Sequence, residues 1–428
     1  MSELRILIHG ALVGDVEQRA AGELVLTYER SWQERDDSFP LSLSMPLAQR
    51  QHSDDAVRPF LEGLLPDNAF ILERWARQFH VSARNPFALL SHMGEDCAGA
   101  VQFVRPERLE EVTSTGPDEV AWLTEEDIAE RLRDLVEQRG TGRLPGDRGH
   151  FSLAGAQPKM PLYFDGARWG IPSGRVPTTH ILKPPARSDL EGFDMNEHLC
   201  LRLARELGLA AAETRLRTFA GQEALVVTRY DRLRTREGRV VRLHQEDTCQ
   251  ALGVSPQRKY QNEGGPGPED IVRLLLRESN HPETDVAAFI DALALNWVIG
   301  GTDAHAKNYS LFLSAGSVRL APLYDLISIL PYPRRVPYKE ARLAMRVDRE
   351  YHLWKIKRRH WEGFALRSEL DPEPLIARVA ELAAAVPSAV EQAAARIRDE
   401  DARHGILEHM EVGIREHSER CLAALASA

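Results

Sequence analysis

The chain has 428 residues, enough for one large core or two to three smaller ones, and its net charge of −10 argues against attraction of the whole protein to nucleic acid. The four cysteines are widely spaced without a CxxC pair, which indicates free thiols in a reducing compartment. No charged-then-apolar leader opens the chain and no apolar run approaches the roughly 20 residues of a membrane span, so we expect a cytoplasmic protein with no membrane contact.

The first hundred or so residues predict a mainly β segment with some helix. Residues 4–8 and 24–28 have strand-like composition, and residues 41–45 alternate with period two, so that one face of this stretch should be buried. From Phe60 the apolar spacing becomes helical. Residues 105–117 lack periodicity and predict a linker.

The elements that follow change from β-rich to α-rich. Thr124 with Asp127 predicts a helix start of the capping-box type, and Gly140 predicts the end of this helix. Residues 141–150 are predicted to form a glycine-rich loop. One helix is predicted at 194–207, and strands are predicted at 161–164, 179–182 and 224–227. Beyond this point the predicted elements are helices, at residues 269–278, 284–298, 373–385, 387–399 and 411–426.

This order predicts an α+β, bilobal, protein-kinase-like fold with a β-rich N-terminal subdomain and a helical C-terminal lobe. We divide the chain into an N-terminal subdomain at 1–110, an N-lobe with a nucleotide loop at 111–228, and a helical C-lobe with a catalytic loop at 229–428. A short hinge at Thr228–Asp231 separates the two lobes.

The most informative motif is G-T-D-A-H-A-K-N at residues 301–308, followed by Asp325, 17 residues after Asn308. Protein-kinase phosphoryl transfer requires three residues in a fixed order along the chain. These are an Asp, an Asn five positions later, and a second Asp beyond a hairpin. Asp303 would orient or deprotonate the attacking hydroxyl, while Asn308 and Asp325 would supply oxygen ligands to Mg²⁺ on ATP phosphates. The alternative is a polar loop with an Asp in a turn.

A candidate nucleotide loop is S-L-A-G-A-Q-P-K at residues 152–159, whose small residues would let backbone N–H groups approach phosphates. It lacks G-x-G-x-x-G and GK[ST], so a plain β-turn is its alternative. Lys183, at the end of a predicted strand, is the candidate counter-charge to the phosphates, or else a solvated lysine. The segment 228–231 could present backbone groups to the adenine edge, or simply enter a loop.

Two features have open roles. His305 lies in the predicted catalytic loop without a His-x₃-His or His-Glu pair, so an orienting or packing role beside Asp303 is favoured over a metal ligand. Residues 330–361 hold ten Lys or Arg and three acidic residues, with Tyr and Trp interleaved. This basic segment could contact DNA phosphates, a tRNA-bound substrate or an acidic partner, or it could be a solvated face with core aromatics.

With these motifs in place, the chain resembles the HipA family of bacterial toxin serine/threonine kinases, from type II toxin–antitoxin modules. The resemblance runs over essentially the whole length, and it includes L-S-L-S-M-P-L at 41–47 and G-L-L-P-D-N at 63–68. Because this N-terminal part is present, the chain resembles the undivided toxin and not the split variety.

The resemblance implies an ATP- and Mg²⁺-dependent protein kinase. Asp303 would be catalytic, Asn308 and Asp325 would hold Mg²⁺, and autophosphorylation of Ser152 would expel the loop and silence the enzyme. The implied ATP-binding residues are Ala154, Gly155, Ala156, Gln157, Lys159, Lys183, Thr228, Arg229, Tyr230, His305, Lys307, Asn308, Tyr324 and Asp325.

The resemblance also implies a target and a partner. The target would be a translation enzyme, usually an aminoacyl-tRNA synthetase, whose phosphorylation arrests growth. The partner would be a helix-turn-helix, HipB-like antitoxin that binds operator DNA, so that contact with DNA would be indirect. Two alternatives stay open: a small-molecule kinase with the same geometry, and a DNA-associated co-repressor module with a vestigial nucleotide site, which the basic segment at 330–361 would support.

Overall fold

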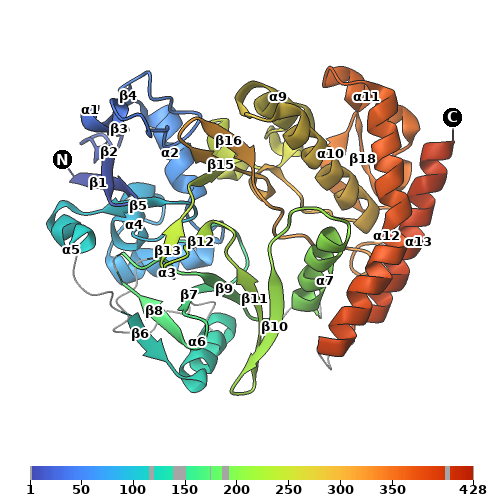
Figure 1. Cartoon of the computed structure of the whole chain (residues 1–428), viewed down its shortest axis with the longest axis horizontal. Coiled ribbons are helices and arrows are strands. Elements are labelled where there is room, and N and C mark those ends of the chain that lie inside the picture. Colours follow the sequence, from blue (N-terminus) through green and yellow to red (C-terminus); the bar gives the residue numbers. More distant parts are fainter. Residues whose placement is uncertain are drawn as a thin grey trace. The chain divides into compact units, whose positions relative to one another are not determined.

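The structure is a computed structural model that describes residues 2–114, 120–137, 151–173, 175–185, 192–400 and 405–427. The predicted loop at 141–150 and the helix end at Gly140 lie outside the described residues. The chain forms two units (Figure 1). The first unit consists of Met1–Pro184, Arg217–Gln257 and Leu311–Val318, and the second of Pro185–Leu216, Arg258–Ser310 and Arg319–Ala428.

The N-terminal part of the first unit contains a five-stranded sheet and three helices. The sheet has the order β4-β3-β2-β1-β5. Its strands are β1 (Ser2–Ile8), β2 (Ala11–Gln18), β3 (Leu24–Tyr28), β4 (Gln51–His52) and β5 (Val101–Val104). The helices are α2 (Asp54–Gly63), α3 (Ala69–Phe79) and α4 (Pro86–Met93), after the short α1 (Arg30–Gln33). The predicted strands at 4–8 and 24–28 are therefore confirmed. The helical spacing from Phe60 falls on the end of α2 and on α3, but α2 begins earlier, at Asp54.

One prediction in this part holds for burial only, and another is wrong. Residues 41–45 form a turn closed by one bridge between Ser42 and Met45, and Leu41 and Met45 are buried as the alternation predicts. Their backbone is held by a carboxylate instead of a neighbouring strand, since the Leu43 N–H donates to Glu246 Oε1 at 2.8 Å. The expected linker at 105–117 begins with the short helices η1 (Pro106–Arg108) and α5 (Leu109–Thr113), because Val112 packs on Leu7 and Val104.

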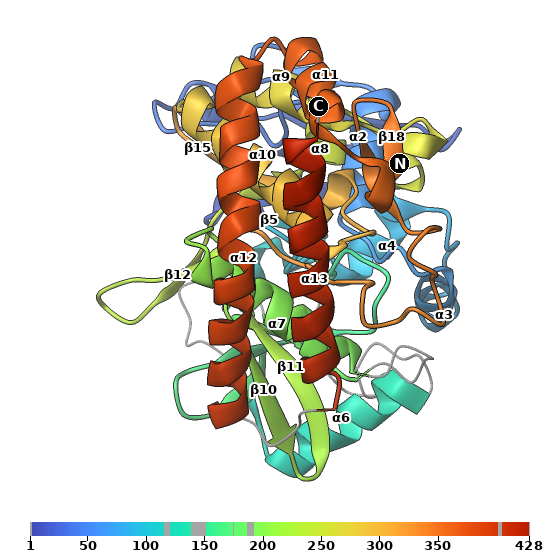
Figure 2. The ribbon, with the colours of Figure 1, turned by 90° about the vertical axis from the view of Figure 1, so that its right-hand side faces the viewer.

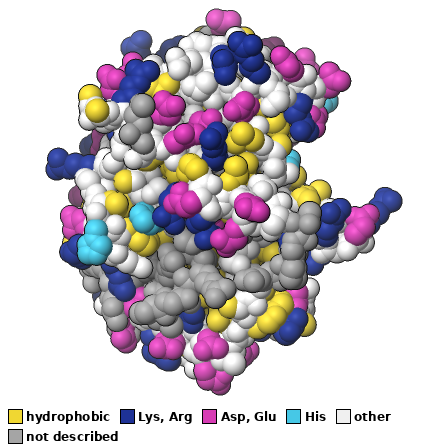
Figure 3. Space-filling model, turned by 90° about the vertical axis from the view of Figure 1, so that its left-hand side faces the viewer, with side chains coloured by type: hydrophobic (Ala, Val, Ile, Leu, Met, Phe, Trp, Pro, Cys, Tyr) yellow, Lys and Arg dark blue, Asp and Glu magenta, His cyan; other side chains and the backbone are white. Residues whose placement is uncertain are grey.

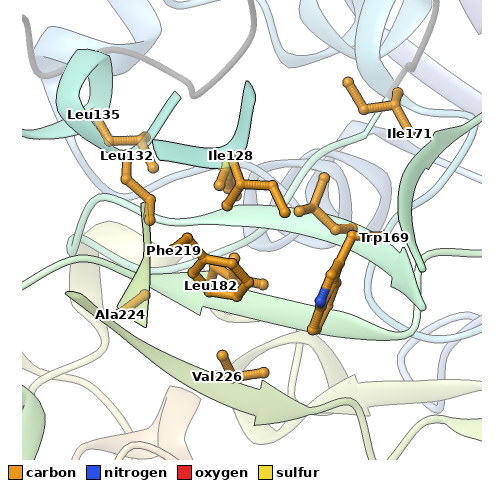
Figure 4. Close-up of a cluster of buried hydrophobic side chains, with 11 residues drawn as sticks. Ile128, Leu132, Leu135, Trp169, Ile171, Leu182, Phe219, Ala224 and Val226 are labelled. Carbon is orange, nitrogen blue, oxygen red and sulfur yellow. The ribbon is translucent and has the colours of Figure 1, made fainter. Parts of the chain in front are cut away.

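A second sheet of the first unit has six strands in the order β10-β11-β9-β7-β8-β6. They are β6 (Val120–Leu123), β7 (Met160–Phe164), β8 (Trp169–Pro172), β9 (His180–Lys183), β10 (Thr214–Phe219) and β11 (Gln222–Thr228). Helix α6 (Glu125–Glu137) begins as predicted, because Asp127 accepts from the Thr124 N–H at 2.8 Å and donates its own N–H to Thr124 Oγ1 at 3.1 Å. Figure 4 shows the apolar face of α6 packed on this sheet, with Ile128, Leu132 and Leu135 near Leu182, Phe219 and Ala224.

Two smaller sheets complete the first unit. One is the hairpin β12 (Arg232–Arg234) and β13 (Val240–Arg242), and the other has the order β14 (Gln245–Asp247), β15 (Ser310–Ser314) and β16 (Ser317–Leu320). The short α8 (Thr248–Ala251) follows β14.

Basic and acidic side chains are interspersed on the face shown in Figure 3.

The second unit is mainly helical. Its helices are α7 (Phe193–Glu206), α9 (Pro268–Glu278), α10 (Pro282–Ile299), α11 (Arg358–Arg367), α12 (Pro372–Glu400) and α13 (Leu407–Ala426), with a two-stranded sheet of β17 (Arg342–Val347) and β18 (Glu350–His352). Figures 1 and 2 show α12 and α13 running antiparallel along each other.

The two helices predicted at 373–385 and 387–399 are one continuous helix, α12, with Pro387 inside it. A proline removes one helical hydrogen bond, which normally ends or kinks a helix. Val386 and Val390, on either side, are fully buried against the helical core, so packing holds the helix together across the proline.

All four cysteines are free and buried, as the sequence predicts. Among the helices of the described ranges, none combines the length and the apolar character needed to cross a membrane.

Candidate active site

The candidate catalytic loop starts where α10 ends. Gly300 caps the helix with a left-handed φ of 69°, and the Gly301 N–H donates to the Asn296 carbonyl at 2.6 Å. A Cβ on Gly301 would lie 2.2 Å from Asn296 Oδ1, so only glycine fits here. The pair of glycines therefore reverses the chain sharply and presents Asp303 at the end of a buried helix.

Within this loop, backbone hydrogen bonds tie Asp303 to Asn308. The His305 N–H donates to the Asp303 carbonyl at 2.9 Å and to Asn308 Oδ1 at 3.2 Å. Asp303 itself is exposed, whereas Asn308 is buried. The His305 ring packs edge-on against Tyr260, with the ring centroids 4.9 Å apart. This contact agrees with the packing role that the sequence favours for His305.

The segment that carries Asp325 is held on both sides. The Leu323 backbone pairs with residues 210 and 212 through two hydrogen bonds of 2.8 Å. Beyond the aspartate, Asn196 of α7 exchanges two hydrogen bonds of 2.8 Å with the backbone of Ser328. Asp325 has a left-handed φ of 57°, a region that Asp tolerates better than most residues.

Tyr324 connects this segment to the catalytic loop. Its hydroxyl donates to the Lys307 carbonyl and lies 2.8 Å from Ser310 Oγ, on the two sides of Asn308. The hairpin of β15 and β16 thus returns the chain so that the segments carrying Asn308 and Asp325 adjoin.

Asn308 and Asp325 suit a magnesium ion. An amide oxygen and a carboxylate oxygen are hard ligands, and the His305 N–H fixes the orientation of the Asn308 amide. No group of three or more His, Cys, Asp or Glu gathers around a common point in the part of the chain that the structure describes. A magnesium site in a kinase takes its other ligands from phosphates and water, so two protein oxygens fit this chemistry.

The candidate nucleotide loop lies in the first unit and is held by the N-terminal segment 64–68. Ser152 is fully buried, and its Oγ donates to the Leu64 carbonyl at 2.8 Å. The Asp67 N–H donates to the Gly155 carbonyl and Asn68 Nδ2 to the Ala156 carbonyl, each at 3.2 Å. Three residues of the loop, Ser152, Gly155 and Ala156, are therefore fixed by hydrogen bonds with groups outside the loop.

Inside the loop, Lys159 folds back so that its Nζ donates to the Ala154 carbonyl at 2.6 Å. Gly155 has a φ of 101°, a conformation that side chains disfavour. A small cavity beside the loop is lined by Phe151, Leu153 and Gln157, among others.

Lys183 is buried at the end of β9, where it pairs in register with Leu225 of β11. Thr228 ends β11 opposite His180. Tyr230 donates its hydroxyl to Gln245 Oε1 at 2.5 Å. The structure thus places Lys183 and Thr228 on two adjacent strands of one sheet.

Arg229 belongs to a buried ion cluster that motif analysis does not reveal. Its guanidinium donates to both carboxylate oxygens of Asp231, at 3.0 and 2.8 Å. The backbone N–H of Arg229 donates to the Thr179 carbonyl at 3.0 Å. Asp96 accepts from Arg232 at 3.0 Å and from Arg242 at 2.9 Å. These contacts give the Arg229 side chain a structural role, and its assignment to ATP binding stays a prediction.

The charges in this ion cluster shift one another's titration. Burial by itself raises the pKa of the Asp96 carboxyl, but the charges of Arg232, Arg242 and Arg229 outweigh burial and hold that pKa well below its usual range. Burial lowers the pKa of Arg232 to about 10. The cluster joins residue 96 to residues 229–242, and the backbone carbonyl of Asp96 also accepts from the Ser152 N–H at 3.1 Å.

The predicted site residues fall into two sets, one in each unit. Residues 152–159, Lys183 and residues 228–230 belong to the first unit, and residues 303–308, Tyr324 and Asp325 to the second. In the second unit, hydrogen bonds link Tyr324 and residues 303–308, and in the first unit Lys183 and Thr228 lie on adjacent strands. Sequence analysis missed Tyr260, whose hydroxyl donates to Asp303 Oδ1 at 2.7 Å, since no motif marks this residue.

Comparison with known proteins identifies the class. The family models described as HipA N-terminal domain and HipA-like C-terminal domain match residues 4–104 and 151–390. HipA of Shewanella oneidensis, a serine/threonine-protein kinase toxin, is 31% identical over 391 residues, which cover 89% of this chain and 86% of that protein. The protein Y4mE of Sinorhizobium fredii is 39% identical over 364 residues, covering 85% and 84%.

A solved structure is similar to this chain over almost its whole length. HipA in the Shewanella oneidensis complex of HipA, HipB and operator DNA has a TM-score of 0.83 and 27% identity, covering 98% of this chain and 97% of that one. The chain is therefore a protein kinase, and the predicted α+β, kinase-like fold is confirmed. It belongs to the HipA family.

Proposed function

We propose that this protein is the toxin of a toxin–antitoxin module and transfers the γ-phosphoryl group of ATP to a serine or threonine hydroxyl of a protein. One observation carries the proposal: Tyr324 and His305 tie Asp303, Asn308 and the segment of Asp325 into one constellation within the second unit. Asp, Asn and Asp in this arrangement supply the acceptor for a hydroxyl proton and two oxygen ligands for a metal.

In this mechanism the exposed carboxylate of Asp303 orients the attacking hydroxyl and takes its proton. The hydroxyl oxygen forms a bond to the γ-phosphorus while the bond from that phosphorus to the oxygen of ADP breaks. Mg²⁺ held by Asn308 and Asp325 would neutralise charge on the phosphates. Lys183 and residues Ala154–Lys159 are proposed to bind the phosphates, and residues 228–230 the adenine edge.

We further propose that the enzyme silences itself at Ser152. The Ser152 hydroxyl is fully buried on the Leu64 carbonyl, so the loop must leave this position before the hydroxyl can be phosphorylated. A phosphate dianion could not return to a buried position beside a carbonyl oxygen, because desolvation and repulsion both oppose it. The modified loop would then stay away from the nucleotide site.

The proposed target is a translation enzyme, an aminoacyl-tRNA synthetase, whose phosphorylation arrests growth in the cytoplasm. The proposed partner is a HipB-like helix-turn-helix antitoxin that connects the kinase to operator DNA. The similarity to HipA in a complex with HipB and operator DNA supports this partner. The division into parts at 1–110, 111–228 and 229–428 remains part of the proposal.

Three residues of the basic segment at 330–361 have structural explanations that do not need the co-repressor alternative. Tyr332 and Trp361 are buried in the core. Arg358 pairs with Glu362 at 2.8 Å and with Glu373 at 2.7 Å. These residues are accounted for by packing and ion pairs, which is the solvated-face interpretation of the segment.

The test is transfer of label from γ-labelled ATP in the presence of Mg²⁺, to the protein itself and to proteins of a cell lysate. Asp303→Asn should fold normally and lose transfer by about a hundredfold or more, because the hydroxyl loses its proton acceptor. Asp399→Asn, the same chemical change on the exposed part of α12, should keep full activity.

Ser152→Ala separates self-phosphorylation from phosphorylation of a target. It should take up no label itself while still labelling a lysate protein. Full activity of Asp303→Asn would reject the assignment of the site. Labelling of a metabolite with no labelled protein would favour the small-molecule kinase.

A further inference from the structure

We infer that Tyr260 is a positioning residue of the kinase, whose hydroxyl holds the Asp303 carboxylate in the orientation that phosphoryl transfer needs. The inference rests on the proposed role of Asp303. The Tyr260 hydroxyl donates to Asp303 Oδ1 at 2.7 Å, the length of a strong hydrogen bond to a carboxylate. Asp303 is exposed, and this contact restrains the rotation of its carboxylate.

The loop around Tyr260 is built to hold the ring in one place. The Tyr260 carbonyl accepts from the N–H groups of Glu263 and Gly265, both at 3.0 Å. At Gly265 a Cβ would lie 1.9 Å from the Arg258 carbonyl oxygen and 2.8 Å from that of Tyr260. Only glycine lets the chain close this tightly, which fixes the backbone that carries the tyrosine.

The same loop is joined to the catalytic loop by further contacts. The Lys259 carbonyl accepts from the Ala306 N–H at 3.4 Å, and the Tyr260 ring packs edge-on against His305. On the other side, Gln261 Oε1 accepts from the Arg346 N–H of β17 at 2.9 Å. Tyr260 is therefore supported from both sides and meets Asp303 at one oxygen.

The decisive variant is Tyr260→Phe, which keeps the ring on His305 and removes only the hydroxyl. We expect kcat for phosphoryl transfer to fall by about tenfold with KM for ATP unchanged, since a misoriented acceptor slows the chemical step and not ATP binding. The matched control is Tyr338→Phe, which removes a hydroxyl that bonds His417 Nδ1 at 3.0 Å elsewhere in the second unit. The control should keep kcat within about twofold.

A double-mutant cycle distinguishes positioning from a general structural role. If Tyr260 acts through Asp303, Tyr260→Phe should cause no further loss in the Asp303→Asn background. If it acts by stabilising the fold, its effect should add to that of Asp303→Asn and appear as a lower unfolding temperature.

The outcomes separate this inference from the proposed function. No transfer by the parent and by Tyr338→Phe would reject the proposed function. Transfer by the parent with equal kcat in Tyr260→Phe would overturn the inference alone, as would additive losses in the double variant. Transfer by the parent, a fall in Tyr260→Phe and no additional loss in the double variant would establish it.

Discussion

The hydroxyl of Ser152 occupies a position where a change of charge has a large effect. The side chain is fully buried, and its Oγ donates to the Leu64 carbonyl at 2.8 Å. Removing the hydroxyl leaves one carbonyl oxygen without this donor, which costs about 1 kcal/mol. Adding a carboxylate places an unpaired charge beside the same oxygen, which the loop can avoid only by moving away.

This contrast gives a prediction for two substitutions at one residue. Ser152→Ala should bind ATP like the parent, whereas Ser152→Asp should bind at least about tenfold more weakly, because the loop leaves the position in which it covers the nucleotide. Titration with a fluorescent ATP analogue measures both affinities. Ser388→Asp, the same substitution at an exposed site on α12, should bind like the parent. Parent-like affinity in Ser152→Asp would contradict the proposed silencing.

Among the elements, the loop from 258 to 267 shows how a turn without a recognisable motif supports a candidate catalytic residue. Its shape depends on Gly265, next to which two backbone carbonyl oxygens leave no room for a side chain. The loop in turn sets the place of Tyr260 beside Asp303. The tight turn at Gly265 therefore fixes the loop that holds Tyr260 beside Asp303.

Gly265→Ala should displace this loop, because the contacts are with backbone atoms that no rotamer change can relieve. We expect kcat to fall at least as far as in Tyr260→Phe, with a cost to the free energy of unfolding of about 1–3 kcal/mol. Gly221→Ala is the control, since Gly221 has a positive φ of 82° that a side chain disfavours but has no neighbour within 4 Å of an added Cβ. It should lose stability without losing kcat, and equal kcat losses in both variants would count against the argument.

At the scale of the whole molecule, two buried histidines make stability depend on pH. His244 of the first unit donates to the Leu41 carbonyl, and His417 of the second unit contacts the Trp297 carbonyl at 3.0 Å. Burial lowers the pKa of each imidazole to about 4, whereas an unfolded histidine titrates near 6.5. Between these values the unfolded chain binds more protons than the folded one, so stability falls as pH falls.

The expected loss is about 2 kcal/mol for each histidine between pH 7 and pH 5, and it levels off below about pH 4. Free energies of unfolding from urea titrations at the two pH values measure it. His244→Gln and His417→Gln should each reduce the difference between the two pH values by this amount, whatever they do to stability at pH 7. The exposed His409→Gln should leave the difference unchanged, and a pH difference that survives in both buried variants would contradict the account.

By itself the sequence determined what depends on near neighbours and on order along the chain. The capping pair Thr124 and Asp127, the strands at 4–8 and 24–28 and the helix at 284–298 follow from local hydrogen bonding and apolar periodicity. The order of Asp303, Asn308 and Asp325 likewise sufficed to predict a kinase, and the family comparisons confirm the class. The individual roles of these residues stay predictions.

Tertiary structure decided what depends on partners far away in the sequence. Asp96 meets three arginines that lie more than a hundred positions further on, Tyr260 meets Asp303, and buried valines carry α12 through Pro387. A buried charge must find a counter-charge and an apolar face must find a surface, but neither requirement specifies which distant residue supplies it. Only the packed fold makes that choice, because it places these groups within bonding distance of one another.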